Sequence, residues 1–437
     1  MAVKKSKPIP TSRLSRLKKF GGLVGGVAAQ MAFDGAAQLI SGRRPSIDDL
    51  LLTPKNMLQL ADKLAHLRGA AMKLGQMMSM DMGELLPEEL AEILAVLRDS
   101  ANPMTPLQLE WMLIENWGDD WRQRVADFEN GPFAAASIGQ VHKATAKDGT
   151  PLAVKIQYPG IIQAIDSDID NLGALLKLTK LVPPQIKLDA LLAEVKSQLN
   201  SEADYRKEAA FLQSYRQRVG HMPAITIPDA IDKLSNERIL TMTYVEGIGL
   251  DKTLAFEQAI RDRLGQTLVE LLVAELFEFR LLQSDPNLAN YLYDPKQDKL
   301  VLLDFGATRP IPQNISDAYR QLIVFVAKGE WANAFEIAVN LGFFQRNSSR
   351  QVQDIFKHMC AIAAEPLLFA GAYDFGQADI AKRIQSLSQS LIPHRHTLGE
   401  PPADALFIHR KVGGLYLLLS KLRAKVNINE LVAPFLK

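Results

Sequence analysis

The sequence predicts a mixed α+β protein in which a small lobe rich in β-strands precedes a larger, mainly helical lobe. Short β-rich runs separated by turn residues concentrate between residues 131 and 250. From about residue 253 onward, apolar residues recur at helical spacing except in one hairpin over residues 291–303. The predicted parts are a basic, glycine-rich segment (1–45), a helical extension (46–130), the β-rich lobe (131–250) and the helical lobe (251–437).

Composition limits the possible function classes. The chain has 437 residues, 47% of them hydrophobic, which suffices for one large domain or two to three ordinary ones. A net charge of +1 gives no reason to expect nucleic acid as a partner. The single cysteine, Cys360, excludes an internal disulfide and suits a reducing compartment. It lies in a helical pattern, where a small buried apolar role is expected, and the seven histidines show no zinc-ligand spacing.

The N-terminal segment leaves several interpretations open. Residues 1–19 are basic and lack acids, and residues 20–29 are apolar and rich in small side chains. Gln30 and Asp34 interrupt this run well short of the ~20 residues that span a bilayer. The segment is compatible with a flexible terminus, with a transit peptide, or with a membrane-proximal helix that has a polybasic flank.

A long amphipathic helix is predicted over residues 54–80, because leucine, alanine and methionine recur there at helical spacing. Lys73 and Gln76 share the flank of that apolar stripe, and Gly75 between them indicates close packing or a bend. Methionines cluster around it at positions 72, 77, 78, 80 and 82; core filling is favoured over a lipid pocket. A second helix is predicted to start at Pro87.

From Gly131 the pattern becomes β. A small-residue stretch, Ala134-Ala135-Ala136-Ser137, leads into a hairpin over residues 141–156 whose turn contains Asp148-Gly149. Lys155 stands in the second strand among alanine, valine and isoleucine, where an ammonium is costly unless it meets an anion.

A long helix over residues 186–218 carries the acids that could provide that anion. Asp204 and Glu208 lie four residues apart and share a face, whereas Glu202 points nearly opposite if the helix is regular. Glu208 is favoured as the partner of Lys155, and Glu202 is the less favoured choice. Two strands follow, over residues 225–228 and 238–244.

Three polar residues frame the hairpin of residues 291–303. Asp285 and Asn290 precede it, and Asp304 follows it in an Asp-Phe-Gly tripeptide, so the hairpin brings all three to one end of a small sheet. This is the layout of phosphoryl-transfer sites. Asp285 would accept a proton or orient water, while Asn290 and Asp304 would bind Mg²⁺ on ATP or ADP. Lys155 would contact the phosphates, with residues 134–137 over them, and Tyr244 and Val245 would present backbone groups to adenine.

With these parts located, the chain resembles the UbiB-type atypical protein-kinase-like family, in particular its coenzyme Q subgroup, from about residue 12 to past residue 420. The motifs are Lys73-Leu74-Gly75-Gln76, the alanine-rich stretch over residues 134–142, Glu202-Ala203-Asp204 and Gln283-Ser284-Asp285-Pro286-Asn287. The alanines replace the glycine-rich loop of ordinary protein kinases, which predicts a stiffer loop. No Ala-Pro-Glu segment follows Asp304.

The resemblance implies a bilobal protein-kinase-like fold with the helical extension packed on it. It implies that Lys73 and Gln76 cover the site where a protein substrate would bind and approach Glu202 and Asp204, an autoinhibitory arrangement. It further implies ATPase activity, a role in ubiquinone biosynthesis, and peripheral association with anionic membranes. Prenylated quinone precursors and quinone-biosynthesis proteins become expected partners. The location would be the bacterial cytoplasmic membrane surface or the matrix face of the mitochondrial inner membrane.

Three hypotheses for function follow. The favoured one is an ATP-hydrolysing kinase-like enzyme that supports prenylated quinone biosynthesis. The second is a kinase for a small molecule or lipid. The third is a nucleotide-gated, non-catalytic module that extracts or presents a hydrophobic precursor, a hypothesis motivated by the methionine cluster and the glycine-rich N-terminal helix.

Overall fold

The computed structural model describes residues 68–82, 103–179, 182 and 188–436. The predicted N-terminal segment (1–45), the first part of the predicted helix over 54–80 and the helix at Pro87 lie outside these residues. The chain forms two compact units. Unit 1 consists of Met1–Ala210 and Asp229–Tyr244, and unit 2 consists of Phe211–Pro228 and Val245–Lys437.

Unit 1 contains an antiparallel sheet whose described strands run in the order β1-β3-β4-β6, with β2 paired to β3. The strands are β1 (Asp127–Phe128), β2 (Ala134–Ala135), β3 (Gly139–Thr145), β4 (Pro151–Gln157) and β6 (Ile239–Thr243). The predicted hairpin is confirmed as β3 and β4, and its turn places Gly149 at a φ of +88°. An L side chain rarely adopts this backbone, which explains the glycine.

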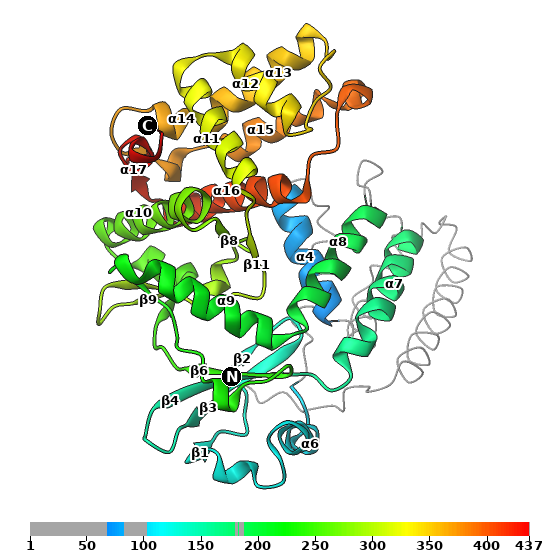
Figure 1. Ribbon diagram of the computed structural model, residues 1–437, viewed down its shortest axis with the longest axis vertical. Helices are drawn as coiled ribbons and strands as arrows, with labels where there is room; N and C mark the ends of the chain where they lie inside the picture. The colour runs from blue at the N-terminus through cyan, green and yellow to red at the C-terminus, as the bar shows by residue number, and fades with distance from the viewer. Residues whose placement is uncertain (1–67, 83–102, 180–181, 183–187, 437) are drawn as a thin grey trace, which may run out of the picture. The chain divides into compact units, whose positions relative to one another are not determined.

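Helices pack around this sheet. Helix α4 (Arg68–Met82) contacts α7 (Ile161–Thr179) and α8 (Leu188–Glu202), and Figure 1 shows the three side by side. Met77 and Met78 of α4 are buried, as expected of core residues. Helix α6 (Pro106–Trp117) lies within the predicted helical extension and begins with a capping box formed by Thr105 and Gln108.

The single long helix predicted over residues 186–218 is wrong. The structure has two helices, α8 and α9 (Tyr205–Arg218), separated at Ala203-Asp204. Asp204 stops the first helix because its side chain accepts from the Arg206 amide and its carbonyl accepts from the Lys207 amide, which starts a new helix. The Tyr205 amide donates instead to the carbonyl of Glu237. The boundary between the two units falls within α9.

Unit 2 contains a sheet in the order β5-β10-β9-β7. The predicted hairpin is confirmed as β9 (Tyr291–Asp294) and β10 (Lys299–Leu302), paired from Tyr291↔Leu302 to Asp294↔Lys299. Strand β5 (Ile225–Thr226) pairs in parallel with β10, not with the strands of unit 1, so its expected place in the β-rich lobe is wrong. Strand β7 (Ile248–Gly249) completes the sheet on β9.

The expectation of helix throughout residues 253–437 outside that hairpin is also wrong. Strand β8 (Leu281–Gln283) pairs with β11 (Thr308–Pro310), and β12 (Tyr373–Asp374) pairs with β13 (Lys425–Val426). These strands have two or three residues, too few for an alternating pattern to emerge from the sequence.

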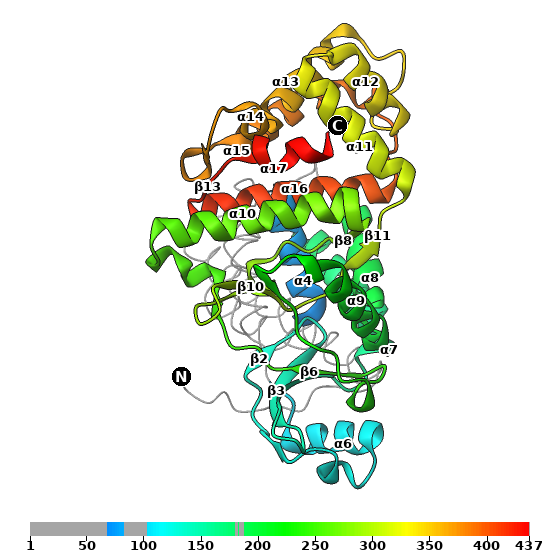
Figure 2. The same ribbon diagram turned by 60° about the vertical axis from the view of Figure 1, so that its left-hand side comes forward.

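The rest of unit 2 is helical. Its long helices α10 (Gln258–Ala274) and α16 (Ala403–Leu422) contact each other and run alongside one another in Figure 2. The remaining α-helices are α11 (Gln313–Lys328), α12 (Trp331–Asn340), α13 (Arg350–Ala363), α14 (Glu365–Leu368), α15 (Ile380–Gln389) and α17 (Ile428–Val432). The mixed α+β class is therefore confirmed.

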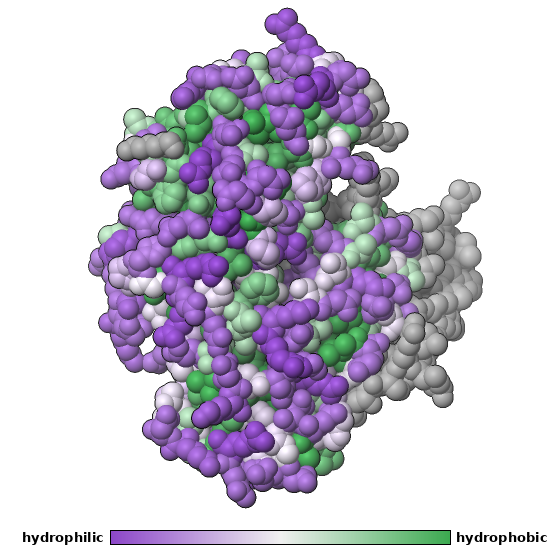
Figure 3. Space-filling view, viewed as in Figure 1, coloured by the Kyte–Doolittle hydropathy of each residue, from purple (hydrophilic) through white to green (hydrophobic). Residues whose placement is uncertain are grey.

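Hydrophilic residues cover most of the surface visible in Figure 3, and apolar residues form separate small patches between them. Among the described residues, no helix combines the length and apolarity needed to cross a membrane.

Candidate functional site

In unit 1, Lys155 and Glu208 form a buried ion pair. The ammonium of Lys155 donates to both carboxylate oxygens of Glu208, at 2.8 and 2.9 Å. Their side chains are only 10% and 2% exposed, so neither charge is compensated by water. The ring of Tyr205 lies 5.0 Å from the Lys155 ammonium. Glu208 is the partner that the sequence favoured, and its place in the first turn of α9 follows from the break at Asp204.

The position of Lys155 is set by the sheet. It lies in β4 opposite Val141 of β3 and Leu240 of β6, so strands flank its backbone on both sides. Backbone pairing fixes the position of the lysine in the sheet, and the ion pair with Glu208 orients its side chain.

The alanine-rich stretch folds into a tight hairpin. Ala134 and Ala135 form β2, and the Ala136 amide donates to the Gly139 carbonyl at 2.9 Å. A Cβ on Gly139 would lie 2.3 Å from the Ile156 carbonyl oxygen, so only glycine fits there. The two alanines of β2 are exposed and Ser137 is half-buried.

Ser137 connects this hairpin to helices α4 and α8 through Glu202. Lys73 of α4 donates to one oxygen of Glu202 and the Ser137 hydroxyl donates to the other, each at 2.6 Å. A Cβ on Gly69 would lie 2.6 Å from the Ser137 carbonyl oxygen, which shows how closely α4 approaches the hairpin. Lys73 is buried, so Glu202 compensates its charge.

The other residues assigned to this region have different places. Asp204 caps the start of α9, and the side chain of Gln76 lies outside the described part of the chain. The Tyr244 amide donates to the Pro151 carbonyl at 2.8 Å, which extends the pairing of β6 and β4. Val245 begins the second of the two segments that make up unit 2.

In unit 2, a short 3₁₀ turn, η8 (Leu288–Asn290), positions Asp285 and Asn290. The Asn287 side chain caps it by accepting from the Ala289 amide. The side-chain NH₂ of Asn290 donates to the Asp285 carbonyl at 3.1 Å. An amide whose nitrogen is engaged in this way has its oxygen, Oδ1, left to act as an acceptor or metal ligand.

Asp304 lies at the same end of the hairpin as Asn290. Asn290 directly precedes β9, Asp304 follows β10, and the Leu303 amide donates to the Asn290 carbonyl at 3.0 Å. One oxygen of Asp304 accepts from the Gly306 amide at 2.9 Å. The register of the hairpin thus places Asn290 and Asp304 at the same end, and Asp285 is linked to this end through the side chain of Asn290.

These residues offer the donor set that Mg²⁺ takes in nucleotide sites, namely carboxylate and amide oxygens with the remaining positions left to phosphates and water. Within the described residues, no group of three or more His, Cys, Asp or Glu side chains could hold a metal unaided. Asn290 and Asp304 fit a Mg²⁺ ion whose other ligands come from nucleotide phosphates and water.

A buried polar cluster behind Asp304 was missed by the sequence analysis. Lys411 of α16 lies 3.1 Å from a carboxylate oxygen of Glu275 and donates to Gln283 Oε1 at 3.1 Å and to the Tyr291 hydroxyl at 3.4 Å. The Tyr215 hydroxyl donates to Glu275. The sequence contains no signal of this cluster, because α16 carries other charged residues besides Lys411 and the partners of Lys411 lie far away in sequence.

Burial shapes the charges of this cluster. Burial alone would lower the pKa of Lys411, but attraction by Glu275 and Tyr291 outweighs it and raises that pKa. Burial raises the pKa of Glu275, against the opposing effects of Lys411 and Tyr215. Burial likewise raises the pKa values of Tyr215 and Tyr291, so both phenols remain protonated donors.

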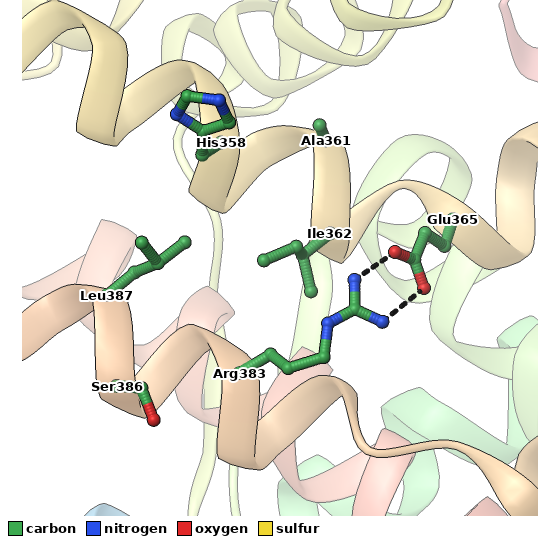
Figure 4. Close-up of a pocket in the computed structure, with 7 residues that line it drawn as sticks. All are labelled: His358, Ala361, Ile362, Glu365, Arg383, Ser386 and Leu387. Atoms are coloured by element: carbon green, nitrogen blue, oxygen red, sulfur yellow. Dashed lines mark hydrogen bonds and ion pairs between the residues drawn. The ribbon is translucent and has the colours of Figure 1, made fainter.

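Unit 2 also has a pocket of about 550 Å³ between α13 and α15. Figure 4 shows Ile362 and Leu387 projecting between the helices, while Arg383 pairs with Glu365. No residue predicted for the phosphoryl-transfer site lines it, and its ion pair already balances its own charges. Cys360 of α13 is half-buried, and burial raises its pKa to about 12, consistent with the unreactive role expected.

Comparison with known proteins shows that the sequence has relatives in a family of atypical kinases. The model of the ABC1 atypical kinase-like domain matches residues 96–338. The mitochondrial atypical kinase COQ8B of Rattus norvegicus is 36% identical over 434 residues, covering 98% of this chain and 81% of that protein. The mitochondrial atypical kinase COQ8 of Saccharomyces cerevisiae is 34% identical, covering 98% of this chain and 85% of that protein.

A solved structure supports the fold. The complex of Rv3197 with erythromycin, from Mycobacterium tuberculosis, superposes with a TM-score of 0.62 at 23% identity, covering 94% of this chain and 98% of that one. Together with the domain match, this likeness confirms the kinase-like α+β fold.

Proposed function

The chain belongs to the UbiB-type family of atypical kinases, and from that premise we propose that it hydrolyses Mg-ATP in support of ubiquinone biosynthesis at a membrane surface. The observation that carries the proposal is the pairing of Lys155 with both oxygens of Glu208. A buried lysine held by a carboxylate is the element that kinase-like sites use to grip nucleotide phosphates.

We propose a role for each of the site residues predicted from the sequence. In unit 1, Lys155 would contact the phosphates and residues 134–137 would cover them, while Tyr244 and Val245 at the unit boundary would bind adenine through their backbones. In unit 2, Asn290 and Asp304 would hold Mg²⁺, which supplies charge neutralisation on the phosphate oxygens. Asp285 would orient the attacking water.

The contact between Lys73 and Glu202 supports hydrolysis over phosphorylation of a protein. It holds α4 against the alanine-rich hairpin through Ser137, where the resemblance expects a cover over the protein-substrate site. Glu202 is thereby engaged by Lys73, and we propose that Lys73, Gln76, Glu202 and Asp204 together restrict access by large substrates.

Phosphate release tests the proposal. The full chain is incubated with Mg-ATP, alone and with vesicles of anionic or zwitterionic lipid. We expect hydrolysis that anionic vesicles increase and that Asp304→Asn reduces by at least a hundredfold, because the metal loses a charged ligand. Asp354→Asn, a neutralisation of an exposed aspartate on α13, is the matched control. Hydrolysis that is unchanged in Asp304→Asn would contradict the mechanism.

The same samples test the competing function. If the protein is a kinase for a small molecule or lipid, labelled phosphate appears on a lipid or quinone-precursor extract and not only in solution. If it is a non-catalytic module, a prenylated phenol binds in a nucleotide-dependent way even in Asp285→Asn.

Complementation of a quinone-deficient strain addresses the biological role. We expect the wild type, but not Asp285→Asn, to restore ubiquinone. Cell fractionation then tests peripheral association with a membrane, and crosslinking tests contact with quinone-biosynthesis proteins. The rat and yeast relatives are named as mitochondrial proteins, which is one of the two locations expected from the sequence.

A further inference from the structure

The polar cluster around Lys411 contacts the loop that carries Asp304, the proposed metal ligand. Its members come from α9, α16, β8, β9 and the π-helical turn Glu275–Phe279 that follows α10. All are at most 3% exposed: Tyr215, Glu275, Gln283, Tyr291 and Lys411. Gln283 makes the hydrogen bond to that loop, because its side-chain NH₂ donates to the Asp304 carbonyl at 3.1 Å.

The orientation of that amide is determined by its neighbours. An ammonium can only donate hydrogen bonds, and the Tyr291 hydroxyl also donates to the amide, at 3.0 Å. Both groups therefore face Gln283 Oε1. The opposite, donating side of the amide must then point to the Asp304 carbonyl. If the amide flipped, its NH₂ would face an ammonium and its oxygen would face a carbonyl oxygen.

Glu275 holds this arrangement together. It balances the charge of Lys411, and one of its oxygens accepts from the Gln283 backbone amide at 3.2 Å. It also accepts from Tyr215, whose ring lies 5.1 Å from that of Phe305, the residue after Asp304. The loop is thus supported at two successive residues by groups that Glu275 anchors.

A buried ion pair is weak evidence of a contribution to stability. Well-packed apolar side chains of similar volume are often as stabilising as a buried ion pair, whose desolvation is costly. The specific consequence of Lys411 and Glu275 is the fixed direction of the Gln283 amide.

We propose that Lys411 and Glu275 are positioning residues for metal binding, which act through Gln283 to hold the backbone of Asp304 where its carboxylate can bind Mg²⁺. This inference rests on the proposed role of Asp304 in the nucleotide site. Residues that orient a metal ligand typically change metal affinity 10- to 100-fold when they are replaced.

Mg²⁺ titration of nucleotide binding tests the proposal without relying on catalysis. Fluorescent N-methylanthraniloyl-ADP is bound to the full chain, and the Mg²⁺ concentration that gives half of the Mg²⁺-dependent signal is measured. Gln283→Leu removes the contact with Asp304 and keeps the ion pair. Lys411→Met/Glu275→Gln removes both charges together, which avoids leaving one of them buried alone. Lys421→Met, an exposed lysine on the same helix, is the control.

We expect the half-saturating Mg²⁺ concentration to rise at least tenfold in Gln283→Leu and in the double variant, and to stay at the wild-type value in Lys421→Met. Thermal unfolding shows which variants are folded. Gln283→Leu keeps the test valid if the double variant does not fold, because it leaves both charges paired.

A folded Gln283→Leu with the wild-type Mg²⁺ dependence overturns the inference and leaves the proposed function intact. Binding of the ADP analogue that is independent of Mg²⁺ in the wild type overturns both. Mg²⁺-dependent binding without ATP hydrolysis contradicts the proposed hydrolysis and supports the inference if Gln283→Leu shows the expected rise.

Discussion

Lys155 and Glu208 form a buried ion pair that affects stability and is part of the proposed nucleotide site. Each charge is buried, and each is tolerated because the other lies within 2.8–2.9 Å. Removing one partner leaves an uncompensated charge in a site that water does not reach, which is more costly than removing both. The proposed contact of this ammonium with nucleotide phosphates depends on the same pair.

We therefore expect Lys155→Met to lower the free energy of unfolding of unit 1 by about 3–5 kcal/mol. Lys155→Met/Glu208→Leu should recover most of that loss, and neither variant should bind nucleotide. Urea unfolding and titration with an ADP analogue measure the two effects. Equal destabilisation by the single and double variants would show that the pair acts only through packing.

His142 is a second buried group whose state follows from its neighbours. Gln140 Oε1 accepts from the Met104 amide, so the Gln140 NH₂ faces His142 Nε2 and donates to it at 2.7 Å. His142 Nδ1 then carries the proton and donates to the Glu129 carbonyl at 2.9 Å. The imidazole is neutral, and burial lowers its pKa.

This predicts a pH dependence of stability. Because the folded pKa is lowered, the unfolded state binds the proton more readily, so stability falls as the pH drops below the unfolded value of about 6.5. Thermal unfolding between pH 5 and 8 should show that stability falls more steeply with decreasing pH in the wild type than in His142→Gln. The variant is expected to be less stable than the wild type at pH 8. Parallel profiles would exclude a contribution from His142.

At the scale of elements, the hairpin formed by β2 and β3 depends on close approach between backbones. Gly139 opens β3 where a side chain would meet the Ile156 carbonyl of β4 and the Tyr205 hydroxyl of α9. The alanines before it need no such space, because β2 is exposed. If this hairpin is stiff, as the sequence predicts, strand pairing contributes to that property as well as the alanines.

Gly139→Ala should destabilise the protein by roughly 1–3 kcal/mol, because a methyl group is forced between packed elements. Gly131→Ala is the matched control, since a Cβ there meets nothing within 4 Å, and it should change stability by less than about 0.5 kcal/mol. Chemical unfolding measures both. A stable Gly139→Ala protein would mean that the strands shift apart at little cost.

At the scale of the whole molecule, nucleotide binding is expected to change the stability of the folded chain. Lys155 and Glu208 belong to unit 1, and Asp285, Asn290 and Asp304 belong to unit 2. A ligand that binds only the folded chain stabilises it by mass action, so thermal unfolding reports binding directly.

Mg-ADP at a hundred times its dissociation constant should contribute about 2.7 kcal/mol and raise the unfolding temperature by roughly 3 °C. Chelation of Mg²⁺ by EDTA should remove most of this rise. Asp304→Asn should show a small rise that EDTA does not change. An equal rise with and without Mg²⁺ in the wild type would contradict the proposed metal role of Asp304.

The sequence by itself determined the features that depend on local spacing. Lys155 can be predicted as a site residue because a charged residue in an apolar strand requires a partner. Asn290 and Asp304 can be predicted because the segment between them shows the two short β-rich runs and the turn of a hairpin. Motif resemblance identified Lys73 and Glu202 as neighbours, and the structure shows their contact at 2.6 Å.

Only the tertiary structure decided what depends on contacts distant in sequence. The break at Asp204 separates Glu202, paired with Lys73, from Glu208, paired with Lys155, and part of it is made by the remote Glu237 carbonyl. The lobe predicted for β5 is wrong because a strand of two residues is too short for its sequence to indicate that it pairs with β10. Lys411 and Glu275 lie 136 residues apart, and no periodicity links them. Their contact exists because packing of the unit 2 helices excludes water, and a buried charge must then find its counterpart within reach.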